Sequence, residues 1–116
     1  MFIHWVADFV LQTNWEATNK SKNNIALLSH TLKYTNIWLA VGVIYVLCNL
    51  HIYTSWHLSY FLLITFVCHT VTDYFTSRLN SRLWKQKEVH KFFVSIGFDQ
   101  FLHYVQLFLT YYLLKS

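Results

Sequence analysis

The feature that most constrains the fold of this chain is a set of three long apolar segments that contain no proline. They extend over residues 24–50, 57–79 and 92–114 and include the runs IWLAVGVIYVLCNL and FLLITFVC. These runs are too long for single strands, and they lack the period-two alternation of a half-buried strand. Because a helix that crosses a bilayer needs about 20 residues, each segment is predicted to span a membrane.

The composition agrees with a membrane protein that has a polar interior. Of the 116 residues, 55% are hydrophobic and only 12% are charged, about half the charged share of ordinary soluble domains. A small soluble domain could not bury so many large apolar side chains. A shorter helix is expected over residues 2–13, tilted or entering the membrane half-way, and the polar loop NWEATNKSKNN follows it. We expect an all-α, polytopic bundle of four helices that forms one integral-membrane domain over residues 1–116.

Basic residues predict how the chain lies in the membrane. The first loop and the stretch SRLNSRLWKQKEVHK, an expected interfacial extension of the third helix, contain seven of them: Lys20, Lys22, Arg78, Arg82, Lys85, Lys87 and Lys91. The positive-inside rule places both segments in the cytoplasm, so both termini are expected to face outward from an inner (plasma) membrane. A basic face on a soluble fold would indicate nucleic-acid binding, but this pattern instead indicates the lipid bilayer as partner.

Each of the three aspartates has a histidine four residues away in the sequence. On a helix, this spacing puts both side chains on one face. Counted from the basic loops, the three pairs lie at a similar depth in the cytoplasmic half of the membrane, as does one histidine of the second helix. The set is His4 with Asp8, His69 with Asp73, Asp99 with His103, and His30.

This set of residues has the donor types of a metal site. Charged groups at membrane depth normally face the bundle interior and are paired or ligated. Imidazole nitrogen and carboxylate oxygen bind zinc, manganese or iron, and seven donors exceed the about four that one zinc takes. We therefore expect one or two divalent ions, with zinc as the first choice and manganese or iron as alternatives. Two other interpretations are structural hydrogen-bonded pairs and a proton relay.

Four residues are candidates for acting on a substrate. Asp73 and Asp99 are candidate catalytic groups, because an aspartate that does not bind metal can serve as a general base. Gln12 lies one turn beyond Asp8 and either binds substrate, orients a ligand or lies at the interface. Arg78 either holds a phosphate or anchors the helix at the membrane surface.

Four ordered motifs give the chain a family resemblance. The segments HWVADFVLQTNW, LLSHTLKY, CHTVTDYFTSRL and FDQFLHYV resemble the pattern HxxxDFxLQ, a histidine in the second helix, HxxxDxxxSR and DQxxH. This is the pattern of the bacterial and phage membrane proteins of the DUF3307 family, whose function is unknown. The resemblance covers nearly the whole chain and implies a membrane fold with a His/Asp site, without naming a reaction. A looser similarity to integral-membrane metal-dependent hydrolases rests on the His/Asp pattern and is an analogy.

The leading hypothesis from the sequence is a membrane-embedded, metal-dependent hydrolase. A site near the cytoplasmic face would suit a lipid head group, a lipid-linked phosphate or an amphiphilic nucleotide. A metal or proton transporter or channel could use the same residues, and with so few helices it would need a homo-oligomer. A third hypothesis is a small phage or bacterial regulatory membrane protein in which the His/Asp cluster is structural.

Overall fold

The computed structural model describes residues 1–48 and 55–115, and in this part of the chain every regular element is helical. The elements are α1 (Phe2–Trp5), the π-helical turn η1 (Val6–Val10), α2 (Asn14–Asn19), α3 (Asn24–Cys48), α4 (Ser55–Lys85) and α5 (Val89–Lys115). The predicted all-α helical bundle is therefore confirmed.

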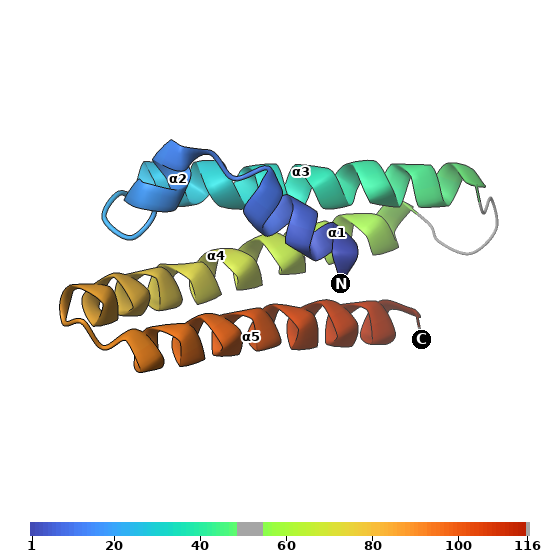
Figure 1. The fold of residues 1–116 in the computed structure, drawn as a ribbon. Coiled ribbons are helices and arrows are strands. Elements are labelled where there is room, and N and C mark those ends of the chain that lie inside the picture. Colours follow the sequence, from blue (N-terminus) through green and yellow to red (C-terminus); the bar gives the residue numbers. More distant parts are fainter. Residues whose placement is uncertain (49–54, 116) are drawn as a thin grey trace.

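Three helices are long and apolar enough to cross a membrane, as predicted. They cover Asn24–Cys48, Trp56–Lys85 and Val89–Leu114. The three lie alongside one another in a bundle 52 Å long, and α5 returns antiparallel to α4 (Figure 1). The end of the second segment at residue 50 and most of the following link lie outside the described residues.

The interior of the bundle is polar and its surface is apolar. Among the described residues, four hydrophobic side chains are buried, whereas twelve polar or charged side chains are buried. Large apolar side chains such as Phe75, Phe98 and Phe108 are instead mostly exposed. A soluble protein would reverse this distribution, so lipid is the surrounding that this surface suits.

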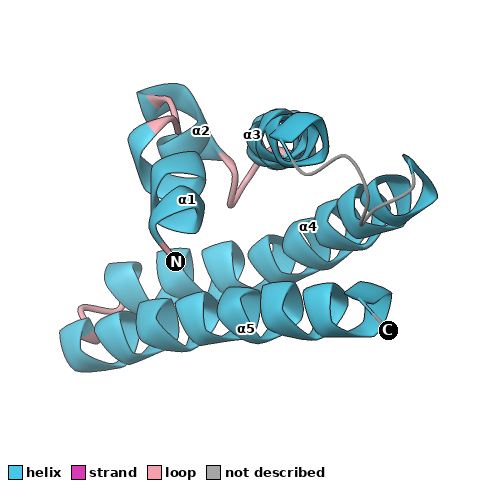
Figure 2. Ribbon diagram, turned by 90° about the vertical axis from the view of Figure 1, so that its right-hand side faces the viewer, coloured by secondary structure: helices cyan, strands magenta, loops and turns pink. Residues whose placement is uncertain are grey.

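The N-terminal segment covers one side of the bundle. Figure 2 shows α1 and α2 beside α3 and above α4 and α5, and η1 and α2 both contact α3. Met1 lies part-way along the bundle, whereas α5 ends toward one of its extremities (Figure 1). The first helix therefore runs only part of the length of the three long ones, as its shortness predicted.

Two local predictions need correction. The first helix was expected to reach residue 13, but it ends at Val10 in a π-helical turn. The segment NWEATNKSKNN was expected to be a loop, but it begins with α2. There, Thr13 and Glu16 form a capping box: the Thr13 hydroxyl accepts a bond from the Glu16 N–H, and the Glu16 carboxylate accepts one from the Thr13 N–H. A Thr-x-x-Glu pattern is a helix-start signal, and it outweighs the turn-forming residues around it.

The basic stretch of residues 77–91 continues the third helix as expected only as far as Lys85, and the rest of it forms a turn and the start of α5. α4 extends to Lys85, and the turn that follows reverses the chain into α5. Lys87 adopts the left-handed conformation with φ of 58°. The N–H groups of Lys87 and Glu88 bond to the carbonyls of Trp84 and Leu83, which satisfies the end of the helix in the manner of a Schellman motif.

Candidate metal centre

Seven histidines and aspartates predicted to share one depth are all buried, on α1, η1, α3, α4 and α5. Each of the seven is at most 9% exposed. The set is His4, Asp8, His30, His69, Asp73, Asp99 and His103. The four-residue spacing puts His69 and Asp73 on one face of α4, and Asp99 and His103 on one face of α5. The packing of η1 and α3 against these helices brings the remaining residues next to them.

A first group of four donors converges on one point. Asp8, His30, His69 and Asp73 each offer one ligand atom, and these atoms lie within 4.8 Å of one another. His30 Nε2 lies 3.0 Å from Asp8 Oδ1 and 3.3 Å from Asp73 Oδ2. His69 Nε2 lies 3.3 Å from His30 Nε2 and 3.5 Å from Asp8 Oδ1. Two imidazoles and two carboxylates are enough donors for a four-coordinate divalent ion.

A second group of donors adjoins the first and shares Asp8 with it. It consists of Asp8, Asp99 and His103. The His103 Nε2 atom lies 3.5 Å from Asp99 Oδ1 and 3.1 Å from Asp73 Oδ1. Asp73 therefore also reaches both groups, since its other oxygen contacts His30. Two adjacent groups that share a carboxylate could hold a pair of ions.

His4 lies beside these groups in a chain of hydrogen bonds. Its Nε2 donates to the Gln100 side-chain oxygen at 2.8 Å, because an amide oxygen only accepts, and Nδ1 accepts from the Tyr34 hydroxyl at 2.7 Å. The Gln100 amide nitrogen in turn donates to Asp8 Oδ2 at 3.1 Å and Asp99 Oδ2 at 3.0 Å. Both ring nitrogens are thus engaged, and His4 orients two carboxylates through Gln100, as outer groups do in metal sites.

Lys20 is part of the cluster, although the sequence indicated a membrane anchor. Its Nζ lies 2.9 Å from Asp73 Oδ2 and 3.5 Å from His30 Nε2. Burial alone would lower the pKa of Lys20, but the nearby carboxylates of Asp73 and Asp8 outweigh burial and raise it. The ammonium therefore stays charged and offsets part of the negative charge of the three aspartates.

Thr76 and Tyr34 complete the surroundings of the cluster. The Thr76 hydroxyl donates to Asp99 Oδ1 at 2.6 Å. The Tyr34 ring stacks on His69, with centroids 3.8 Å apart. Sequence reasoning assigned no site role to Tyr34, Gln100 or Thr76, and it placed Lys20 at the membrane surface. For Gln100 and Tyr34 the available signal was their place inside the quoted motifs DQxxH and LLSHTLKY.

Comparison with known proteins gives one match. The family model described as Protein of unknown function (DUF3307) matches residues 1–116, the whole chain. The chain belongs to the DUF3307 family. No curated protein and no solved structure matches it. The resemblance drawn from the four motifs is thereby confirmed.

In this DUF3307 chain, a cavity of about 700 Å³ borders the cluster, and we call it the polar cavity. Asp8, Asp99 and Gln100 line it, as does Gln12, a predicted substrate residue. Asp73 is not among the lining residues, so the two predicted catalytic aspartates differ in access.

Arg78, the other predicted substrate residue of this DUF3307 chain, lies apart from the cluster. Its guanidinium donates to the Tyr74 carbonyl at 2.9 Å and to Asn24 Oδ1 at 2.8 Å, and it lies 3.6 Å from the centre of the Tyr74 ring. These contacts fasten α4 to the start of α3. The structure does not bring Arg78 to the His/Asp groups.

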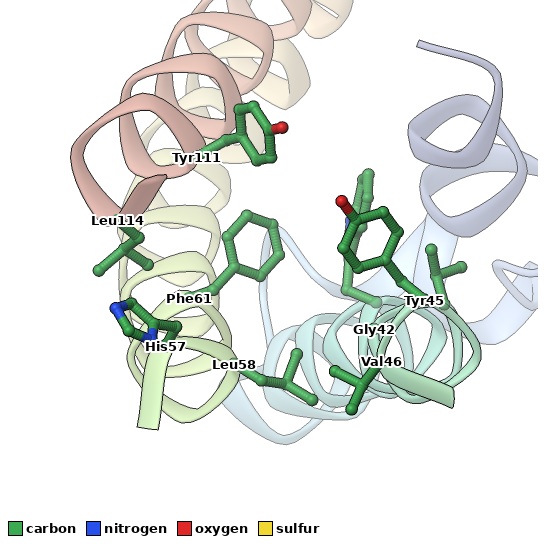
Figure 3. A pocket seen from close by; sticks show the side chains of 10 residues that line it. Gly42, Tyr45, Val46, His57, Leu58, Phe61, Tyr111 and Leu114 are labelled. Atoms are coloured by element: carbon green, nitrogen blue, oxygen red, sulfur yellow. The ribbon is translucent and has the colours of Figure 1, made fainter. Parts of the chain in front are cut away.

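A second hollow of the DUF3307 bundle, of about 220 Å³, has a different character. Figure 3 shows Tyr45, Phe61 and Tyr111 around it, contributed by α3, α4 and α5. Its lining is almost entirely apolar, and it lies toward the end of the bundle opposite the basic turns. None of the predicted site residues lines it, whereas Asp8, Asp99 and Gln12 line the polar cavity.

Proposed function

We propose that this protein is an integral-membrane, metal-dependent hydrolase that acts on a lipid-linked or phosphorylated substrate near the cytoplasmic face. The observation that carries the proposal is that Asp8 belongs to both donor groups. A carboxylate shared between adjacent groups is the arrangement that holds two divalent ions close together in many hydrolytic sites.

The donor set supports one or two divalent ions, with zinc as the first choice. Zinc accepts mixed imidazole and carboxylate ligands, as manganese and iron also do. We assign Asp8, His30, His69 and Asp73 to one ion, and Asp8, Asp99 and His103 to the other. A bound ion would polarise a phosphoryl or acyl oxygen and make water a better nucleophile.

When only the group of Asp8, His30, His69 and Asp73 holds an ion, Asp99 binds no metal and is the better placed of the two candidate general bases. Its side chain is 13% exposed, whereas that of Asp73 is 3% exposed and paired with Lys20. Asp99 also lines the polar cavity. In hydrolysis, water transfers its hydroxyl to the phosphorus or acyl carbon and a proton to the leaving oxygen. An aspartate beside the attacking water can take up its proton and pass it on.

The sidedness that we propose follows from the two basic turns. The α2–α3 connection and the α4–α5 turn lie at the same end of the bundle (Figure 1). The positive-inside rule then puts this end, and with it the mouth of the polar cavity, at the cytoplasmic face of an inner (plasma) membrane. α5 ends toward the opposite end of the bundle, so the C-terminus would face outward.

Metal analysis tests the proposal directly. The metal content of the purified protein is measured by mass spectrometry beside that of Asp8→Asn and His103→Ala, and His90→Ala serves as the control because His90 is exposed and outside both groups. We expect bound divalent metal in the parent and the control, and reduced content in the two site variants. A metal-free parent, or full loading of both site variants, would refute the metal centre.

A metal or proton transporter is the second candidate, and one observation favours it. Buried polar side chains continue from the cluster toward the opposite end of the bundle. Gln106 donates to Thr65 Oγ1 at 3.3 Å and to Thr110 Oγ1 at 3.0 Å. Such a row could lead an ion or proton across the membrane. Flux into proteoliposomes that Gln106→Leu abolishes would favour transport, whereas hydrolysis without flux would favour the enzyme.

A further inference from the structure

The polar cavity has a second wall that the proposed metal centre does not use. Its inner end is formed by Asp8, Asp99 and Gln100, and we call its exposed end, lined by Lys22 and Lys85, the mouth. Along this wall lie side chains of α4, of the α2–α3 connection and of the segment between η1 and α2. None of them is a candidate metal ligand, so their presence in the cavity calls for another explanation.

Three polar atoms on this wall have hydrogen-bonding capacity to spare. Gln12 Oε1, Ser77 Oγ and Asn80 Oδ1 are buried, and within residues 1–48 and 55–115 none of them has a hydrogen-bond partner. All three residues line the polar cavity. Burying an unpaired polar atom costs about 1–3 kcal/mol. Gln12 Oε1 and Asn80 Oδ1 only accept hydrogen bonds as they stand, but turning either amide presents its N–H group instead. Three such groups on residues that line one cavity therefore suit a polar occupant.

The mouth of the cavity is positively charged. Lys22 and Lys85 are both exposed and both line it. In the described part of the chain neither lysine forms an ion pair, whereas Lys20 is bound to Asp73. The same two lysines also line a smaller hollow next to the cavity. Two unpaired ammonium groups above a buried polar wall suit an anion with several oxygen atoms, such as phosphate.

Apolar side chains also line the cavity, and they are exposed. They are Phe9, Trp84 and Phe93, which are 44%, 60% and 62% exposed. In a membrane these side chains would contact acyl chains, so a ligand could extend from the cavity into lipid. The cavity therefore combines a place for a phosphate group with a lateral surface for a hydrocarbon substituent.

We propose that the polar cavity binds the phosphate of a phosphate monoester. Lys22 and Lys85 supply the charge. The Ser77 hydroxyl and the amide N–H groups of Asn80 and Gln12, once these amides turn, donate the hydrogen bonds. This assignment rests on the proposed function in one respect only: the metal centre places the ester bond of the bound monoester next to the metal ions. Without metal, Asp8 and Asp99 repel the phosphate. Metal and phosphate therefore strengthen each other's binding.

Two binding measurements test this site. Affinity for inorganic phosphate is measured by calorimetry on the full chain in phosphatidylcholine nanodiscs, with zinc and with chelator. Retention of phosphatidic acid, a lipid monoester, is compared with that of phosphatidylglycerol, a diester, by native mass spectrometry. The variants are Lys22→Gln/Lys85→Gln and Ser77→Ala/Asn80→Ala. The control Lys87→Gln/Lys91→Gln removes the same charge from residues that do not line the cavity.

We expect the cavity lysine variant to lose about tenfold or more in affinity for the monoester, and the control variant to lose less than about twofold. If only phosphatidic acid binds, the natural ligand is a lipid phosphate monoester. If only inorganic phosphate binds, the natural ligand is a soluble phosphate compound. The site is refuted if neither probe binds, if diester and monoester bind equally, or if both lysine variants lose the same affinity. Metal content is followed in parallel. A parent that takes up no metal even when zinc is supplied, but binds phosphate through the two lysines, would refute the hydrolase and leave the phosphate site standing.

Discussion

Glu16 is a buried carboxylate outside the metal centre, and it provides a quantitative test of how the N-terminal segment is held. Its oxygens accept hydrogen bonds from the Thr13 N–H at 2.9 Å and from the Ser29 hydroxyl at 2.6 Å. The carboxylate also forms an ion pair with Lys33 at 2.9 Å. These contacts connect α2 to α3. The substitution Glu16→Gln keeps the shape and the capping box but removes the charge.

The magnitude follows from the pKa of Glu16. Burial alone would raise it, but the hydrogen bonds from Ser29 and Thr13 and the Lys33 ammonium lower it from the ordinary 4.5 to about 2. At about 1.4 kcal/mol per pKa unit this corresponds to about 3 kcal/mol. Because the Lys33 side chain is 46% exposed and screened by solvent, we reduce the expectation to about 2 kcal/mol.

Hydrogen exchange of the α2 amides measures this contribution. A loss of about 2 kcal/mol makes local opening about 30-fold more frequent in Glu16→Gln. Because the folded pKa lies below the unfolded one, the stabilisation is complete above pH 4.5 and is lost as the pH falls toward about 2. The difference in α2 opening free energy between the parent and Glu16→Gln should therefore disappear as the pH falls through this range.

Glu88→Gln is the matched control for this measurement. Glu88 forms an exposed ion pair with Lys91 at 3.2 Å, so its loss should cost less than about 1 kcal/mol. Equal protection of α2 in the parent and Glu16→Gln, or a difference that persists unchanged at pH 2, would refute the reasoning.

Three further predictions concern the metal centre. Gln100→Leu removes the link between His4 and two carboxylates, so zinc affinity should fall about 10- to 100-fold, and competition with a chromophoric chelator would show it; unchanged affinity would contradict the role of Gln100. Lys20→Met removes a cation 2.9 Å from Asp73, so zinc affinity should rise several-fold in the same titration, and a fall would show that Lys20 supports the site. Chelation of the parent should lower its melting temperature in detergent, because a ligand that binds only the folded state stabilises it; Gln100→Leu should show a smaller shift.

The local sequence pattern was sufficient to predict the fold class and many of the residues of the candidate site. Length and hydropathy predict a spanning helix from one segment at a time, without knowledge of its neighbours. The four-residue spacing of His69 with Asp73 and of Asp99 with His103 fixes each pair on one helix face for the same reason. Burial of these pairs follows, because a bilayer leaves such groups only the interior.

The sequence was less informative where distant segments meet. Lys20 was assigned to the membrane surface because its neighbours are polar, but the α2–α3 connection folds back and brings its ammonium to Asp73. His4 has the same spacing from Asp8 as the other pairs, but its partners are Tyr34 and Gln100. Spacing along one helix cannot reveal such partners, because they come from other helices.

The sequence by itself therefore determined that the chain forms three helices long and apolar enough to span a membrane, and which faces of them are polar, since both depend on the pattern of residues along a single segment. Only the tertiary structure decided that Asp8 is shared by two donor groups and that a polar cavity opens beside Asp99. These features depend on the angle and depth at which η1 meets α3, α4 and α5, and packing between helices sets that geometry.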